Sequence, residues 1–134
     1  MIYYQKGSET SVLTSEDLRE GLTVTLDKSG VVKKALALPP DYTRYHSFAG
    51  NLTWIADQIL GDRLTDIMPA IGTHKPMTAE EINSMYSGMN KDKFRIHDWR
   101  KDVVTLGEVP GEYLSEISEG RVNYNWPAQV NRLL

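Results

Sequence analysis

The sequence contains no cysteine among its 134 residues. This absence excludes disulfide bonds, thiolate metal sites, iron–sulfur clusters and cysteine nucleophiles, and it is typical of proteins from a reducing compartment. No apolar run approaches the length of about 18 residues that indicates a membrane-spanning helix, and the N-terminus lacks the apolar stretch of a signal peptide. We therefore expect a cytoplasmic protein that does not associate with a membrane.

The sequence also lacks a cluster of charges of one sign. Lys and Arg number 15 and Asp and Glu number 18, which leaves a net charge of −3 that is spread evenly. Such a surface attracts a phosphate backbone weakly, so we expect no nucleic-acid partner. A length of 134 residues, with 40% hydrophobic and 25% charged residues, is typical of one globular domain, and we predict a single domain over residues 1–134.

Strand and helix patterns alternate along the middle of the chain. Three apolar runs predict strands: Val31–Leu38, Thr65–Ile71 and Phe94–His97. Apolar residues at helical spacing predict a helix over residues 47–60, and a capping box of Thr78 and Glu81 predicts the start of a second helix that ends near Gly88. This order is typical of α/β proteins with right-handed crossovers, so we expect a Rossmann-like parallel sheet with flanking helices.

The ends of the chain carry shorter signals. Ile2–Gln5 predicts a strand, and Thr14–Glu20 predicts one or two helical turns that Gly21 ends. Near the C-terminus the pattern predicts a fourth strand over Val103–Leu106, a turn over residues 107–111 and an edge strand over Ala128–Leu133.

A polar cluster follows each of the three predicted strands, at residues 41–44, 72–75 and 97–100. Parallel strands point the same way, so the clusters would meet at the carboxyl edge of the sheet, where open α/β folds bind ligands. The candidate site residues are Asp41, Thr43, Arg44, His74, Lys75 and His97. No two histidines have the helical spacing of metal ligands, so no metal site is predicted.

Structural roles compete with these assignments. Thr43 or Ser47 is suited to capping the helix that follows, Asp41 to a turn, and His97 to pairing with Asp98 at a strand end. Arg44 is a natural clamp for a carboxylate or a phosphate, because its guanidinium presents a planar fork of donors. The residues by themselves therefore predict an α/β domain with a polar rim that attracts anions.

The polar clusters resemble motifs of a known family. The match comprises Asp-x-Thr-Arg at residues 41–44 and Gly-Thr-His at residues 72–74, followed in order by residues 76–78, 80–82, 97–98, 106–107 and 131–132. In this ordered set, which covers nearly the whole chain beyond residue 31, the sequence resembles the nickel-dependent lactate racemase family. Residues such as Ser47 and Trp99 are more similar to a distinct branch of relatives than to the lactate racemases themselves.

The resemblance implies the N-terminal domain of a two-domain racemase or epimerase that acts on a small 2-hydroxy acid. In this family a histidine takes the hydroxyl proton while a nickel pincer nucleotide accepts a hydride from carbon. The resemblance makes His74 one of two acid–base histidines, and Asp41, Thr43 and Arg44 residues that hold cofactor and substrate. The family's cofactor lysine, nickel-binding histidine and second acid–base histidine match no residue here, so we expect the C-terminal domain to be missing and no cofactor to bind this chain alone.

A function of another class fits the same residues. The chain is alternatively a non-catalytic module that binds a carboxylate or phosphate, or a domain that docks a partner. If the chain is one domain of a larger enzyme, the tail around Trp126 and Val130 is expected to present an apolar surface to the missing domain.

The first testable prediction concerns the chain by itself. Because its residues match neither the cofactor lysine nor the nickel ligand of the family, we expect no racemase activity on 2-hydroxy acids and no tight nickel binding. Polarimetric assays and isothermal titration with Ni²⁺ measure both. Micromolar or tighter binding, with a coordination spectrum that depends on His74 or His97, would contradict this expectation.

Overall fold

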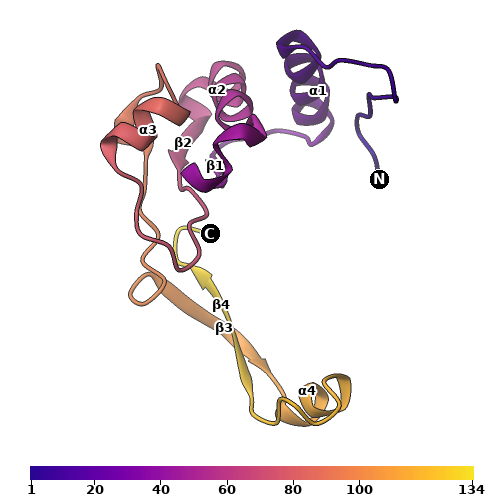
Figure 1. The fold of residues 1–134 in the computed structure, drawn as a ribbon, viewed down its shortest axis with the longest axis vertical. Helices are drawn as coiled ribbons and strands as arrows, with labels where there is room; N and C mark the ends of the chain where they lie inside the picture. Colours follow the sequence, from indigo (N-terminus) through magenta and orange to yellow (C-terminus); the bar gives the residue numbers. More distant parts are fainter. The chain divides into compact units, whose positions relative to one another are not determined.

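In the computed structural model, which describes residues 1–134, the chain folds as two units, Met1–Ile96 and His97–Leu134. Figure 1 shows helices gathered around short strands in the first unit and a long two-stranded ribbon in the second. The sequence predicts one domain over residues 1–134, whereas the structure divides the chain between Ile96 and His97, before the last residue of the third predicted strand. The two units are described in turn.

The first unit is built on two parallel strands, β1 (Ala35–Ala37) and β2 (Leu64–Ile67). Their pairing continues past the strand ends, since Met68 N–H donates to the Ala37 carbonyl at 2.9 Å and Ala70 N–H donates to the Pro39 carbonyl at 2.7 Å. β1 is shorter than the predicted run of residues 31–38. Its register with β2 begins only at Ala35, so residues 31–34 of the predicted run lie outside the sheet.

The predicted third strand is reduced to one parallel bridge between Phe94 and Ile67, in which Arg95 N–H donates to the Ile67 carbonyl at 2.8 Å. The α/β class and the parallel pairing of the first two predicted strands are confirmed. The structure has a small parallel sheet of two strands with helices around it, and this sheet is not clearly a Rossmann fold.

The helices of the first unit begin where short polar signals predict. α1 (Ser15–Lys28) and α3 (Ala79–Met85) each start with a complete capping box, formed by Thr14 with Asp17 and by Thr78 with Glu81. α2 (Ala49–Leu60) confirms the helix predicted between the first two strands. Three 3₁₀ segments complete the unit: η1 (Tyr42–Ser47), η2 (Gly61–Arg63) and η3 (Lys91–Lys93).

Two expectations for the N-terminal region are wrong. Gly21 does not end α1, because it lies in the middle of the helix, where its missing Cβ leaves room for the ring of Tyr4. Ile2–Gln5 is not a strand, because it pairs with no other segment; the Tyr3 carbonyl instead accepts from Lys28 Nζ at 3.0 Å.

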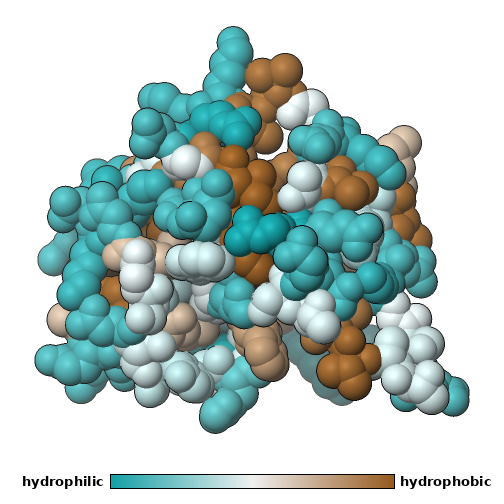
Figure 2. Space-filling model, turned by 90° about the horizontal axis from the view of Figure 1, so that it is seen from above, coloured by the Kyte–Doolittle hydropathy of each residue, from teal (hydrophilic) through white to brown (hydrophobic).

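The core of the first unit lies between the parallel strands and α3. Its buried side chains are those of Leu60, Leu64, Ile67, Met85, Tyr86 and Met89. Burial of each such side chain contributes about 1.5–3 kcal/mol relative to exposure, so this cluster fixes α3 against β2. Hydrophilic residues cover most of the face drawn in Figure 2, with apolar residues visible between them.

The second unit is an antiparallel hairpin of β3 (Val103–Val109) and β4 (Trp126–Asn131), with α4 (Gly111–Ile117) between the strands. The predicted turn over residues 107–111 is wrong. Gly107 to Val109 continue β3 after a register shift that follows Thr105, and Pro110 then caps α4. A Gly-Glu-Val-Pro-Gly sequence satisfies a bulged strand followed by a helix start as well as it satisfies a turn.

One face of this hairpin is apolar. Strand residues alternate between faces, so Trp126, Ala128 and Val130 share a face with their partners Val109, Gly107 and Val104. Trp126 is 51% exposed and stacks on Tyr124 with 5.9 Å between ring centroids. Every buried apolar side chain of the chain belongs to the first unit, and the buried residue of the hairpin unit is Asn131. Nowhere does a helix combine the length and apolar character needed to cross a bilayer.

The close packing of α2 on α3 leads to the second testable prediction. A Cβ on Gly50 would lie 2.0 Å from the backbone oxygen of Met85, which cannot move without shifting α3. We expect Gly50→Ala to destabilise the chain by about 3 kcal/mol, at the upper end of overpacking costs. Urea unfolding followed by circular dichroism measures the effect.

Gly21→Ala is the matched control in another helix of the same unit. A Cβ there would lie 2.9 Å from the ring of Tyr4, a half-buried side chain that can shift without moving any backbone. The higher helix propensity of alanine, about 1 kcal/mol, then makes this variant neutral or stabilising. Equal destabilisation by the two variants would show that the contact with Met85 is not the cause.

Candidate functional site

The candidate site lies where the two parallel strands end. Asp41 follows β1 and caps η1, whereas His74 follows β2 in a turn closed by a hydrogen bond of 2.9 Å from His74 N–H to the Ile71 carbonyl. Because β1 and β2 are parallel neighbours, both turns leave the carboxyl edge of the sheet. His74 Nδ1 and Asp41 Oδ2 are 2.7 Å apart, although the residues are separated by 33 positions in the sequence.

The carboxylate of Asp41 is buried and held from several sides. Its Oδ1 accepts hydrogen bonds from the backbone N–H of Thr43, at 3.1 Å, and from the Thr43 hydroxyl, while Oδ2 faces His74. The backbone carbonyl of Asp41 accepts from Arg44 N–H at 3.0 Å. These bonds leave Asp41 6% exposed and fix the direction of its carboxylate.

Two opposing effects act on the pKa of Asp41. Burial raises the pKa, because it penalises the charged form, but the hydrogen bonds from Thr43 and His74 favour the charged form and prevail. The pKa of Asp41 is therefore below its ordinary value of 3.8. Asp41 is a carboxylate at neutral pH, and its Oδ2 accepts a hydrogen bond from Nδ1–H of His74.

The imidazole of His74 is open to solvent on its other side. Its side chain is 59% exposed, and Nε2 has no hydrogen-bond partner in the structure. Gly72, with a φ of 58°, supplies the left-handed residue that the turn before His74 requires. Because the Nδ1 proton is directed at Asp41, the lone pair of a neutral His74 lies on Nε2. A histidine held in one tautomer by a carboxylate is equipped to accept and return a proton.

Tyr86 contacts the residue before Asp41, and the sequence pattern does not identify it as a site residue. Its hydroxyl donates to the Pro40 carbonyl at 2.7 Å, and its ring is buried. Burial, and then the charge of Asp41, raise the pKa of Tyr86, so its hydroxyl remains a donor. The sequence pattern placed Tyr86 in the apolar stripe of the second helix. The available signal was chemical: a buried tyrosine hydroxyl requires a hydrogen-bond partner.

The structure brings Asp41, Thr43 and His74 into direct contact. Arg44 and Lys75 are their neighbours in the chain and are exposed, and neither makes an ion pair. The N-cap residue of α2 is Phe48, and the hydroxyl of Ser47, the other capping candidate, accepts a hydrogen bond from Ala49 N–H at 3.3 Å. Thr43 thus serves Asp41 rather than the helix.

His97 belongs to the second unit. Its Nδ1 accepts a hydrogen bond from the side-chain amide of Asn131 at 2.9 Å, so its pairing with Asp98, considered from the sequence, is not formed. Asp98 Oδ1 instead accepts from Arg100 N–H at 3.0 Å. A binding role for His97 stays a prediction.

The residues of this chain do not fit a nickel pincer nucleotide by themselves. No group of three or more His, Asp or Glu side chains is arranged to hold a metal ion. His74 could offer only Nε2 as a ligand, because Asp41 holds Nδ1.

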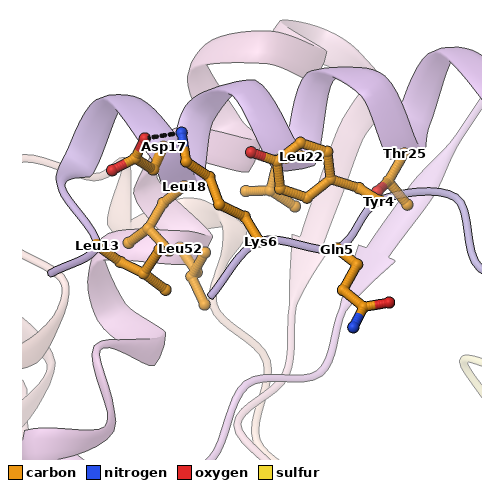
Figure 3. A pocket seen from close by; sticks show the side chains of 10 residues that line it. Tyr4, Gln5, Lys6, Leu13, Asp17, Leu18, Leu22, Thr25 and Leu52 are labelled. Atoms are coloured by element: carbon orange, nitrogen blue, oxygen red, sulfur yellow. Dashed lines mark hydrogen bonds and ion pairs between the residues drawn. The ribbon is translucent and has the colours of Figure 1, made fainter. Parts of the chain in front are cut away.

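A cavity of about 400 Å³ lies beside α1 (Figure 3) and is lined mainly by apolar side chains. Its lining residues include Tyr4, Leu13, Leu18, Leu22 and Leu52. The charged groups at its edge, Lys6 and Asp17, are bonded to one another. The cavity includes no residue of the Asp41–His74 pair and contributes nothing to that site.

No protein-family model matches the chain, and no curated protein matches it. A solved structure with a similar fold is a Thermotoga maritima protein of unstated function, with a TM-score of 0.73 and 31% sequence identity. The match covers 97% of this chain and 32% of that one, so this chain spans about a third of the length of the Thermotoga protein. The fold described here therefore recurs inside a longer polypeptide.

The third testable prediction follows from the pKa of Asp41. A carboxylate with a lowered pKa in the folded state stabilises the protein fully above its unfolded value of 3.8, and this stabilisation disappears as the pH falls through the folded pKa. We expect Asp41→Asn to lower the free energy of unfolding by about 2 kcal/mol at pH 6, because it weakens hydrogen bonds to a charged group. The loss should shrink as the pH falls below 3.8.

Urea titrations at pH 6 and at low pH measure this difference. Asp62→Asn is the matched control, because Asp62 is exposed in η2 and makes no ion pair. A deficit of Asp41→Asn that did not depend on pH would show that the charge of Asp41 is not responsible.

Proposed function

We propose that this chain is the N-terminal, substrate-binding part of a 2-hydroxy-acid racemase or epimerase, in which His74 is an acid–base residue. The observation that carries the proposal is the 2.7 Å contact from the ionised Asp41 to Nδ1 of an exposed His74. This pair lies at the carboxyl edge of parallel strands, which is the position of ligand sites in open α/β folds. The resemblance of the polar clusters to the lactate racemase family supplies the substrate class.

In this proposal Nε2 of His74 accepts the hydroxyl proton as the hydroxyl-bearing carbon is oxidised to a 2-oxo intermediate. Asp41 stays ionised and stabilises the imidazolium that forms. The resemblance implies that a nickel pincer nucleotide, held by residues other than these, would accept and return the hydride. In this proposal His74 would hold the hydroxyl proton and return it to oxygen, and this chain would be inactive alone.

Arg44 is the proposed clamp for the substrate carboxylate. It lies three positions after Asp41, in η1, and its guanidinium is exposed and without an ion pair. A guanidinium fork binds a carboxylate through two parallel hydrogen bonds, whereas a lysine offers a point charge. Lys75, next to His74, adds positive charge that favours an acidic substrate.

A non-catalytic carboxylate-binding module would use Arg44 and Lys75 in the same way. It would have no use for a histidine held in one tautomer by a buried carboxylate. The Asp41–His74 pair is therefore the feature that favours an enzyme.

The fourth testable prediction concerns His74 in the full-length enzyme. We expect His74→Ala to lower kcat about 10³-fold, which is the usual contribution of a general acid–base residue, while circular dichroism shows an intact fold. His46→Ala is the matched control, because His46 is an exposed histidine of η1 whose ring contacts Tyr45. Turnover that survives His74→Ala would place the proton acceptor elsewhere.

The same assay separates binding from chemistry at Arg44. We expect Arg44→Lys to raise KM about 10-fold with a smaller change in kcat, because lysine keeps the charge but loses the fork. A full-length protein that binds 2-hydroxy acids without converting them would favour the binding module.

A further inference from the structure

Tyr86 connects the hydrophobic core to the turn that carries Asp41. It directly follows α3, where its N–H donates to the Ile82 carbonyl at 2.8 Å, and its ring lies 5.2 Å from that of Phe94 between centroids. The residue is 2% exposed. Its ring packs among apolar side chains, whereas its hydroxyl donates to the Pro40 carbonyl, 2.7 Å away.

The two prolines before Asp41 can form backbone hydrogen bonds only through their carbonyl groups. Pro39 and Pro40 have no N–H to donate, so their backbone offers acceptors alone. Ala70 N–H occupies the Pro39 carbonyl, and Tyr86 occupies the Pro40 carbonyl. Pro40 also forms an isolated parallel bridge with Ala70. The Tyr86 hydroxyl adds the side-chain hydrogen bond to the peptide that leads directly into Asp41.

The same helix is attached to both halves of the Asp41–His74 pair. The loop that carries His74 runs into the capping box of Thr78, where α3 begins, and Tyr86 stands at the other end of α3. The helix is fixed by core packing of Met85 and Tyr86 against the β2 side chains. The backbones that carry Asp41 and His74 are thus both connected to α3.

We propose that Tyr86 is a positioning residue whose hydroxyl, by holding the Pro40 carbonyl, directs the Asp41 carboxylate at Nδ1 of His74. Tyr86 acts through Asp41 and is not a catalytic residue. Its effect on the Asp41–His74 pair stands independently of any reaction, whereas its effect on turnover rests on the proposed function. The raised pKa of the hydroxyl supports this role, because the donor persists at every pH at which the pair works.

Tyr86→Phe removes one oxygen and keeps the ring, so it tests the hydrogen bond rather than the packing. The readout is the tautomer of His74 in the present chain, measured from the ¹⁵N chemical shifts of its two ring nitrogens. In the unaltered chain we expect the proton of the neutral ring on Nδ1. In Tyr86→Phe we expect a shift towards the Nε2 tautomer, together with a rise in the pKa of Asp41 towards 3.8.

Two further variants separate positioning from general destabilisation. Tyr45→Phe loses a hydroxyl that has no hydrogen-bond partner in the structure, and it should leave the tautomer unchanged. Met89→Ala weakens the same core without removing a contact to Pro40. It should lower the stability of the chain but leave the population of the Nδ1 tautomer of His74 unchanged. An unchanged tautomer in Tyr86→Phe would overturn the proposal, as would an equal change in Met89→Ala.

Turnover in the full-length enzyme is measured separately. We expect Tyr86→Phe to lower kcat about 10-fold with KM changed less than about 2-fold, because misdirection of a catalytic group reduces the rate more than binding. An altered tautomer in a protein without racemase activity would support the positioning role and refute the proposed function. A loss of turnover with an unaltered tautomer would refute the positioning role.

Discussion

The parallel pairing of β1 with β2 is the constraint on which the candidate site depends. The turns after two parallel neighbours leave the same edge of a sheet, and here those turns carry Asp41 and His74. An antiparallel pairing of the same strands would send the two side chains to opposite edges. The buried cluster that includes Leu64 and Met89 keeps the strands and α3 in place. The same packing therefore supports both the stability of the first unit and the geometry of the site.

Electrostatics explains why Asp41 stays ionised although it is buried beside His74. Burying a carboxylate is costly unless hydrogen bonds replace the lost water, and Asp41 receives these bonds from Thr43 and His74. The hydrogen bonds keep Asp41 ionised, and the ionised Asp41 in turn fixes the imidazole of His74. Tyr86 extends these interactions to the core, because its hydroxyl donates to the backbone carbonyl of Pro40. The exposed imidazole of His74 is therefore connected to the buried carboxylate of Asp41 by a direct hydrogen bond.

The two units differ in how their apolar residues are used. The first unit encloses a core, whereas the hairpin of β3 and β4 presents an apolar face that includes Val104 and Trp126. A two-stranded hairpin is at best marginally stable in water unless its face is packed. The fold also recurs within a Thermotoga maritima chain about three times as long.

The sequence by itself determined the features that depend on neighbouring residues. The capping boxes of α1 and α3 and the polar clusters after the strands were all predictable, because their signals span a few positions. Local signals misled where two structures share them, as in residues 107–111, which continue β3 and begin α4 instead of turning. The tertiary structure alone decided that Asp41 bonds to His74, that His97 turns to Asn131, and that Tyr86 reaches Pro40. These contacts join residues more than 30 positions apart, and their existence depends on strand register and core packing, which no short stretch of sequence encodes.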